Sequence, residues 1–125
     1  MKELKFYHCT HCGRVVEELV AGKDTPVCCG EEMELLVANT QDAATEKHVP
    51  VITRKDGKVI VKVGSASHPM TDAHFIQFIA LVSEKGVQRV DLTPSVEPKA
   101  EFIDPEGSIA AYEFCNLHGL WKAEA

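Results

Sequence analysis

Short stretches in which apolar and polar residues alternate, separated by polar turns, run through the last two thirds of the chain. A period of two places the apolar side chains on one face of a half-buried strand. The clearest pair covers residues 49–53 and 58–63, because the Asp56-Gly57 dipeptide between them is a strong signal for a tight hairpin turn. Further strands are predicted at residues 87–92, 100–104 and 109–114. The pattern predicts a domain that is mainly β.

One apolar segment interrupts this alternation. Residues 74–82 are apolar at nearly every position, and periodicity alone does not distinguish a strand buried on both faces from a buried helix. Its Phe and Ile content and its short length favour a central strand. With roughly five to seven short strands, polar turns and no pattern that predicts a helix, the expected fold is an immunoglobulin-like β-sandwich.

Residues 1–36 form a different kind of region, short and rich in cysteine. Residues 14–20 predict a short strand, and the glycines of this region favour turns. So small a segment has too little apolar surface to fold unaided, and a bound metal would supply the missing stability. Residues 37–47 are small and polar and predict a linker, which leaves residues 48–125 for the β-sandwich.

The composition narrows the possible functions and the compartment. A formal net charge of −6 disfavours a general nucleic-acid-binding protein, because phosphate binding needs a basic face. No stretch is apolar enough to cross a membrane, and the N-terminus lacks the apolar core of a signal peptide, so we expect a cytoplasmic protein. In that reducing compartment an odd count of five cysteines favours metal binding over disulfides.

The first group of candidate ligands is the cysteine cluster Cys9, Cys12, Cys28 and Cys29. Four thiolates form a tetrahedral site that suits zinc or a single iron, and the sequence does not choose between them. Both adjacent cysteines can ligate one ion only if the backbone bends sharply between them, so we expect a distorted site. On spacing alone a purely structural zinc knuckle fits equally well, and a Cys28–Cys29 disulfide is a third interpretation. The neighbouring His8 and His11 are interpreted as surface residues or as donors to the ligands.

The second group is dispersed over the predicted sandwich: His48, His68, His74, Cys115 and His118. A single histidine is seldom a ligand, but the Cys115-Asn-Leu-His118 spacing allows a thiolate and an imidazole to converge on one ion. All histidines outside the first cysteine knuckle fall in this domain, beside its only cysteine. Five donors leave one position of an octahedral metal open for chemistry. The aromatic residues Phe75, Phe78 and Trp121 are interpreted as core.

The ligand motifs resemble a known family. Cys9-Thr-His-Cys12-Gly with Cys28-Cys29-Gly resembles the small rubredoxin-like module called desulforedoxin. Glu46-Lys47-His48-Val-Pro-Val, His68-Pro-Met, His74 and Cys115-Asn-Leu-His118-Gly resemble the catalytic domain of superoxide reductase. Over essentially its whole length, the chain is similar to two-iron superoxide reductases, the desulfoferrodoxins.

This resemblance implies an oxidoreductase with two non-haem irons per chain, one in each cluster. The second iron would take four equatorial histidines and an axial thiolate from Cys115, and would reduce superoxide to hydrogen peroxide without producing dioxygen. Glu46 would close the sixth position of the oxidised iron, and Lys47 would attract superoxide. The family also implies a homodimer, a rubredoxin-like electron donor and a role in detoxification.

Two other functions remain possible at this point. The first is a structural protein in which a zinc knuckle precedes an immunoglobulin-like domain and the histidines are incidental. The second is a simple iron or zinc electron carrier whose second site has no catalytic role.

Overall fold

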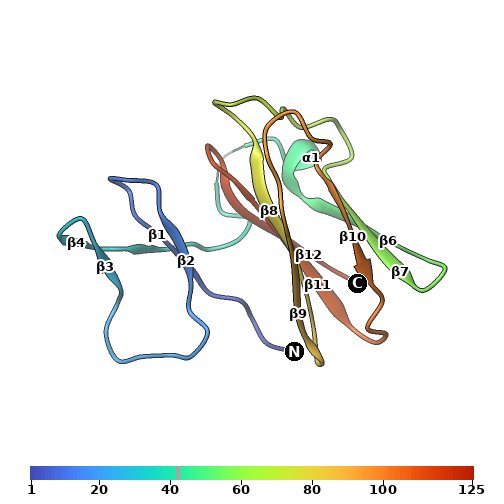
Figure 1. Cartoon of the computed structure of the whole chain (residues 1–125), viewed down its shortest axis with the longest axis horizontal. Helices are drawn as coiled ribbons and strands as arrows, with labels where there is room; N and C mark the ends of the chain where they lie inside the picture. The colour runs from blue at the N-terminus through green and yellow to red at the C-terminus, as the bar shows by residue number, and fades with distance from the viewer. Residues whose placement is uncertain (42) are drawn as a thin grey trace. The chain divides into compact units, whose positions relative to one another are not determined.

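The computed structural model describes residues 1–41 and 43–125 and divides into two compact units (Figure 1). The smaller unit is Glu3–Val37, and the larger consists of Met1–Lys2 and Ala38–Ala125. Among the described residues, the only helix is a single turn, too short to span a membrane. The fold is mainly β, as predicted.

The smaller unit consists of short antiparallel strands around very little core. Its three-stranded sheet has the order β2-β1-β5, and a separate hairpin joins β3 to β4. The strands are β1 (Phe6–His8), β2 (Val15–Glu17), β3 (Val27–Cys28), β4 (Glu31–Glu32) and β5 (Glu34–Leu35). Strand β2 lies within the region predicted as a strand. Leu4, Phe6 and Met33 are the large apolar side chains buried in the described part of this unit, which agrees with the expectation of a core too small to be self-sufficient.

The turn of the β3–β4 hairpin contains the sharp bend expected between the adjacent cysteines. Cys29 and Gly30 are its two central residues, and both adopt a left-handed backbone, with φ of 54° and 75°. A two-residue type I′ hairpin turn requires positive φ at both of its central positions. The glycine accepts this conformation readily, whereas for Cys29 it is uncommon.

The larger unit is a β-sandwich of two antiparallel sheets. One sheet has the order β10-β7-β6 and the other β12-β11-β8-β9. The strands are β6 (Pro50–Lys55), β7 (Lys58–Val63), β8 (Ile76–Ser83), β9 (Gly86–Asp91), β10 (Lys99–Ile103), β11 (Ile109–Cys115) and β12 (Gly119–Glu124). Alternate residues Val59, Val61 and Val63 of β7 pack with Ile79 and Leu81 of β8 in one continuous core. The period-two pattern therefore buries one face of each sheet, as the sequence predicts.

Two local predictions for this unit are confirmed. The Asp56-Gly57 turn joins β6 to β7, with φ of 53° and 77° at its two central residues. Strand β8 lies between β11 and β9 and is buried along most of its length, which explains why its sequence lacks alternation.

Two elements of the larger unit were not predicted. Strand β12 pairs with β11 from Ala110↔Glu124 to Cys115↔Gly119, but its consecutive buried residues Leu120 and Trp121 hide the period of two. The single-turn helix α1 (Thr45–His48) is too short to show a helical period. It spans residues expected to be linker and the first residue of the sandwich.

Candidate metal centres

The four cysteines of the smaller unit converge at the ends of two tight turns. In the first turn, the Gly13 amide donates to the Cys9 carbonyl at 3.0 Å and the Cys12 amide points at the Cys9 sulfur at 3.5 Å. The second turn is the β3–β4 hairpin. The sulfur of Cys28 lies 3.6 Å from that of Cys12 and 3.9 Å from that of Cys29. A tetrahedral ion with metal–sulfur bonds of about 2.3 Å separates its sulfurs by about 3.8 Å, so the four thiols fit a metal ion.

The protonation of these thiols also favours a cation. Hydrogen bonding from the backbone amide of Cys12 lowers the pKa of Cys9 to about 6. Contacts with the neighbouring sulfurs, that of Cys9 first, raise the pKa of Cys29 to about 12. The crowded sulfurs therefore resist carrying several negative charges unless a cation neutralises them. All five cysteines of the chain are free, so the disulfide interpretation is wrong.

His11 lies beside this cluster and contacts a carboxylate. Its Nε2 atom contacts the Glu31 carboxylate at 2.8 Å in a solvent-exposed pair. The hydrogen bond that His11 donates to the Glu31 carboxylate, aided by the charge of that carboxylate, raises the pKa of His11. The structure thus places His11 on the surface, as predicted.

The five dispersed candidates of the larger unit come together at one end of the sandwich. Their donor atoms all lie within 4.8 Å of one another, although His48 and His118 are 70 positions apart. The five are His48 at the end of α1, His68 after β7, His74 before β8, Cys115 at the end of β11 and His118 in the β11–β12 turn. The pairing of β11 with β8 shifts register between Phe114 and Cys115, and such irregularities commonly redirect a side chain near a site.

The four imidazole rings form a closed square. His48 neighbours His68 and His118, and His74 neighbours the same two rings, so His48 and His74 are opposite corners. Neighbouring ring centroids are 4.7–4.9 Å apart, and neighbouring planes cross at 77–90°. Four rings in this arrangement point one nitrogen each toward a common centre.

The nitrogens at this centre carry lone pairs. The Nδ1 atom of His48 donates to the Ala44 carbonyl at 2.7 Å, and that of His68 donates to the Pro69 carbonyl at 2.6 Å. In a neutral imidazole the other nitrogen is then an acceptor. The two Nε2 atoms nevertheless lie 3.1 Å apart, so two lone pairs face each other without a proton between them. A cation resolves this repulsion, and backbone carbonyls commonly orient metal-bound histidines in the same way.

The remaining donors support the same interpretation. The buried Nε2 atom of His74 has no hydrogen-bond partner among the described residues, which is costly for a buried polar atom unless an ion binds it. The Nδ1 atom of His118 lies 3.1 Å from His48 Nε2 and 4.0 Å from the sulfur of Cys115. The residues present therefore fit a metal ion held by four nitrogens and one sulfur.

Burial favours the neutral form of three of these imidazoles. Desolvation lowers the pKa of His68 to about 4 and also lowers the pKa values of His48 and His74. Desolvation raises the pKa of Cys115, while the backbone amides of Leu117 and His118 act in the opposite direction. At neutral pH the lone pairs are free to bind a metal, whereas the Cys115 thiolate depends on a nearby cation.

We expect the free energy of unfolding of metal-free protein to fall as the pH drops from about 6.5 to about 4. In this window the unfolded chain protonates His68 and the folded protein does not, which stabilises the unfolded state by about 3 kcal/mol at most. Urea unfolding followed by the fluorescence of Trp121, the single tryptophan, measures the effect. His68→Gln should reduce the pH dependence, and pH-independent unfolding of the unsubstituted chain would contradict the expectation.

Trp121 covers one side of the cluster. Its ring stacks on His48, with centroids 5.0 Å apart and planes at 24°, and its Nε1 atom donates to the His118 carbonyl at 3.0 Å. It is almost fully buried, at 1% exposure. The interpretation as core is therefore right about burial but omits its contacts with two candidate ligands.

Asn116 joins the two segments that carry His74 and His118, and sequence reasoning missed it. Its Oδ1 atom accepts a hydrogen bond from the Phe75 amide at 2.9 Å, and its Nδ2 atom donates to the Ala73 carbonyl at 2.9 Å. The two bonds bind the residues on either side of His74. The only sequence signal was the position of Asn116 between Cys115 and His118.

Asn116→Asp is therefore expected to weaken metal binding at this centre by about 10- to 100-fold, as is typical when a residue supporting a ligand is lost. A carboxylate oxygen would face the Ala73 carbonyl in place of a donor. Asn39→Asp is the matched control, because Asn39 makes a similar pair of bonds to the backbone of Lys122. Competition with a metallochromic chelator measures affinity, and equal affinities for the two variants would disprove the role.

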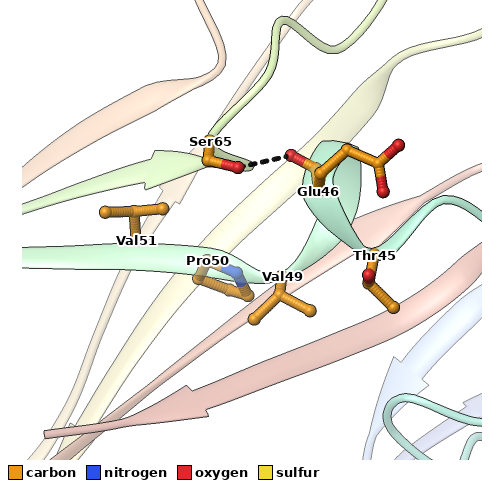
Figure 2. A pocket seen from close by; sticks show the side chains of 6 residues that line it. All are labelled: Thr45, Glu46, Val49, Pro50, Val51 and Ser65. Carbon is orange, nitrogen blue, oxygen red and sulfur yellow. Dashed lines mark hydrogen bonds between the residues drawn. The ribbon is translucent and has the colours of Figure 1, made fainter.

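Glu46 and Lys47 lie on α1 beside the cluster, and both are solvent-exposed. Burial is the main cause of the lowered pKa values of His48 and His74. The positive charge of Lys47 lowers them further, so the electric field of Lys47 reaches the cluster. Glu46 is one of the residues that line an open pocket of about 370 Å³, and Figure 2 shows its side chain extending away from Ser65. The structure therefore brings together the five predicted ligands and places these two charged residues next to them.

A buried carboxyl group near the cluster was also not predicted. Glu113 has 0% exposure, and its carboxyl oxygens have no hydrogen-bond partner among the described residues. Burial raises its pKa well above the ordinary value, which favours the neutral form of the group. Only its spacing on β11, two residues before Cys115, could have suggested that it points to the interior.

The chain contains two separate donor clusters, one in the β-sandwich and one in the small cysteine-rich unit. Together they define a candidate two-centre metalloprotein. The chain matches the family model described as Desulfoferrodoxin over residues 40–124, and that described as Desulfoferrodoxin, N-terminal domain, over residues 1–36. It belongs to the desulfoferrodoxin family.

Named relatives cover the whole chain. A desulfoferrodoxin from Syntrophotalea carbinolica is 48% identical over 98% of both chains. A desulfoferrodoxin homolog from Archaeoglobus fulgidus is 45% identical over 96% of both. The crystal structure of the superoxide reductase from Treponema pallidum superposes with a TM-score of 0.79 at 34% identity, covering 98% of this chain and 99% of that one.

Proposed function

We propose that the chain is a superoxide reductase, which reduces superoxide to hydrogen peroxide without releasing dioxygen. The observation that carries the proposal is the convergence of four imidazoles and one thiol on a single centre, in a member of the desulfoferrodoxin family. When bound there, ferrous iron supplies the electron that superoxide takes up together with two protons.

The two clusters have different roles in this proposal. His48, His68, His74, Cys115 and His118 would hold the reactive iron. The second set would hold an iron that only passes electrons: Cys9, Cys12, Cys28 and Cys29. Four thiolates saturate a tetrahedral ion, whereas five donors are one fewer than an octahedral ion accepts. That difference in donor number supports assigning the chemistry to the larger unit.

Cys115 and the histidines set the charge of the reactive centre. Backbone carbonyls fix the tautomers of His48 and His68 so that their lone pairs face inward, and burial prevents their protonation. The Cys115 thiolate then contributes the single negative charge among the five donors. Trp121 excludes water from the side of the centre that it covers.

Lys47 counteracts the charge of the protein as a whole. At a net charge of −6 the chain repels an anionic substrate, and an exposed ammonium whose field reaches the cluster restores local attraction. This attraction acts within about 10 Å at an ionic strength of about 0.1 M. Glu46, as the family resemblance implies, is the carboxylate that would ligate the oxidised iron.

We further propose a cytoplasmic homodimer that receives electrons from a rubredoxin-like carrier and removes superoxide. Free cysteines in odd number suit a reducing compartment. The smaller unit exposes Leu19, Val20 and Val27 by 69%, 86% and 65%, and burying such side chains against a second copy would remove apolar surface from water.

The alternative functions are less well supported. A structural zinc protein with incidental histidines does not explain why four rings form a square with their lone pairs directed inward. A simple electron carrier does not need a site with fewer donors than its metal accepts.

The test is to add superoxide to anaerobically reduced protein and to measure both products. Stoichiometric hydrogen peroxide with no dioxygen supports the proposal. Dioxygen evolution would indicate dismutation instead, and unaltered decay of superoxide would indicate a protein with no role in its removal.

A further inference from the structure

The loop that follows β7 holds the backbone of α1 from one side. The Ala66 amide donates to the Glu46 carbonyl at 2.9 Å, and the Ser65 hydroxyl donates to the same oxygen at 3.3 Å (Figure 2). The Gly64 amide donates to the Val49 carbonyl at 3.2 Å. Three consecutive residues of one loop thus bind both ends of the segment that carries Glu46, Lys47 and His48.

Gly64 is the point of closest approach in this contact. It is buried and has a φ of +74°. A Cβ atom there would lie 2.6 Å from the Glu46 carbonyl oxygen and from the Lys47 carbonyl carbon. Ordinary contacts of a Cβ begin at about 3.4 Å. The opposing atoms belong to the backbone, so they cannot rotate away as the end of a flexible side chain can.

Helix α1 depends on this support because it has little internal structure. It contains four residues, and its own backbone bonds are those from Val49 to Thr45 at 2.9 Å and from Lys47 to Ala44 at 3.2 Å. The Glu46–Lys47 peptide is planar, so a shift of the Glu46 carbonyl also moves the Cα of Lys47. The loop therefore determines the position of the charged side chains on α1.

We propose that Gly64 is a positioning residue that fixes Lys47 beside the five-donor centre and thereby sets the rate of superoxide capture. This inference rests on the proposed function. The attraction between Lys47 and superoxide falls with distance and with screening by solvent, so a displaced ammonium loses effect. A side chain at position 64 displaces α1 without replacing any candidate ligand and without changing the net charge of the protein.

The test compares Gly64→Ala with Gly57→Ala. Gly57 lies at the other end of β7 and has a nearly identical φ of +77°, but an added Cβ there would meet nothing within 4 Å. Both variants thus carry the same backbone strain, and only Gly64→Ala displaces α1. We expect Gly64→Ala to capture superoxide about three- to tenfold more slowly and with a flatter salt dependence, whereas Gly57→Ala should match the unsubstituted protein.

A double-mutant cycle with Lys47→Met tests whether Gly64 acts on superoxide capture through Lys47. If Gly64 acts through Lys47, the double variant should be no slower than Lys47→Met alone, because the two changes remove the same interaction. Unchanged capture by Gly64→Ala, or a loss that simply adds to that of Lys47→Met, would overturn the inference.

Amide hydrogen exchange in the zinc-loaded protein gives a readout independent of activity. The amides of Gly64 and Ala66 should exchange faster in Gly64→Ala than in Gly57→Ala, and equal exchange would contradict the proposed contact.

If Gly64→Ala does not fold, Ser65→Ala removes one bond to Glu46 without adding a clash, and a normal capture rate and salt dependence would then overturn the inference. If unsubstituted protein fails to consume superoxide, the proposed function is wrong, while exchange still tests the contact.

Discussion

Cys115→Ser is expected to abolish superoxide reduction. The sulfur is fully buried at the convergence of the four rings, and a serine hydroxyl there stays protonated and cannot supply the same charge. The loss should exceed the roughly 10- to 100-fold that follows removal of a residue that only supports a ligand. Stopped-flow measurement of superoxide consumption, together with the iron content of anaerobically purified protein, distinguishes an inactive loaded centre from an empty one.

The matched control is Cys12→Ser, which removes one thiol from the other cluster. It should eliminate the visible absorption of the four-thiolate iron and leave capture of superoxide by the prereduced protein intact. A fully active, iron-loaded Cys115→Ser protein would disprove the role of this sulfur. Complete inactivity of prereduced Cys12→Ser would show that the two centres cannot be separated in this way.

Lys47→Met is expected to slow superoxide capture by about tenfold and to flatten its dependence on ionic strength. The substitution removes the ammonium but retains an unbranched side chain. Because Lys47 is exposed and contributes no ligand atom, the absorption spectrum of the iron should not change. Pulse radiolysis at several salt concentrations measures both the rate and its slope.

Lys58→Met is the control for the change in net charge. Lys58 begins β7, at the end opposite the loop that holds α1, and lies 3.9 Å from the Glu101 carboxylate. Both variants change the net charge from −6 to −7, so general repulsion affects them equally. Equal rates for the two variants would show that the overall charge, and not the position of Lys47, determines capture.

The sequence predicted the parts of the fold that depend on local patterns. Alternation identified β6 and β7, and the Asp56-Gly57 turn fixed their register. The continuous apolar run of residues 74–82 indicated the central strand β8. Strand β12 could not be found in this way, because Trp121 packs against His48 while Leu120 is also buried. Tertiary contact, and not the pattern, makes both residues internal.

The candidate ligands could be found from residue type, but the geometry of the centre could not. The positions of the histidines and cysteines along the chain already divide them into two sets, and the resemblance to a family implies a role for each set. The square of rings and the inward lone pairs depend on hydrogen bonds to Ala44 and Pro69 carbonyls, which no sequence pattern records. The supporting roles of Asn116 and Gly64 were missed for the same reason: each acts on backbone atoms of residues distant in sequence.

X-ray absorption at the iron edge of Cys12→Ser protein, with iron only in the second centre, shows directly which atoms surround that iron. We expect a shell of imidazole nitrogens with one sulfur scatterer, and loss of that sulfur in the Cys12→Ser/Cys115→Ser double variant. An iron surrounded only by oxygen or nitrogen in Cys12→Ser, or a centre that takes up no iron, would contradict this expectation.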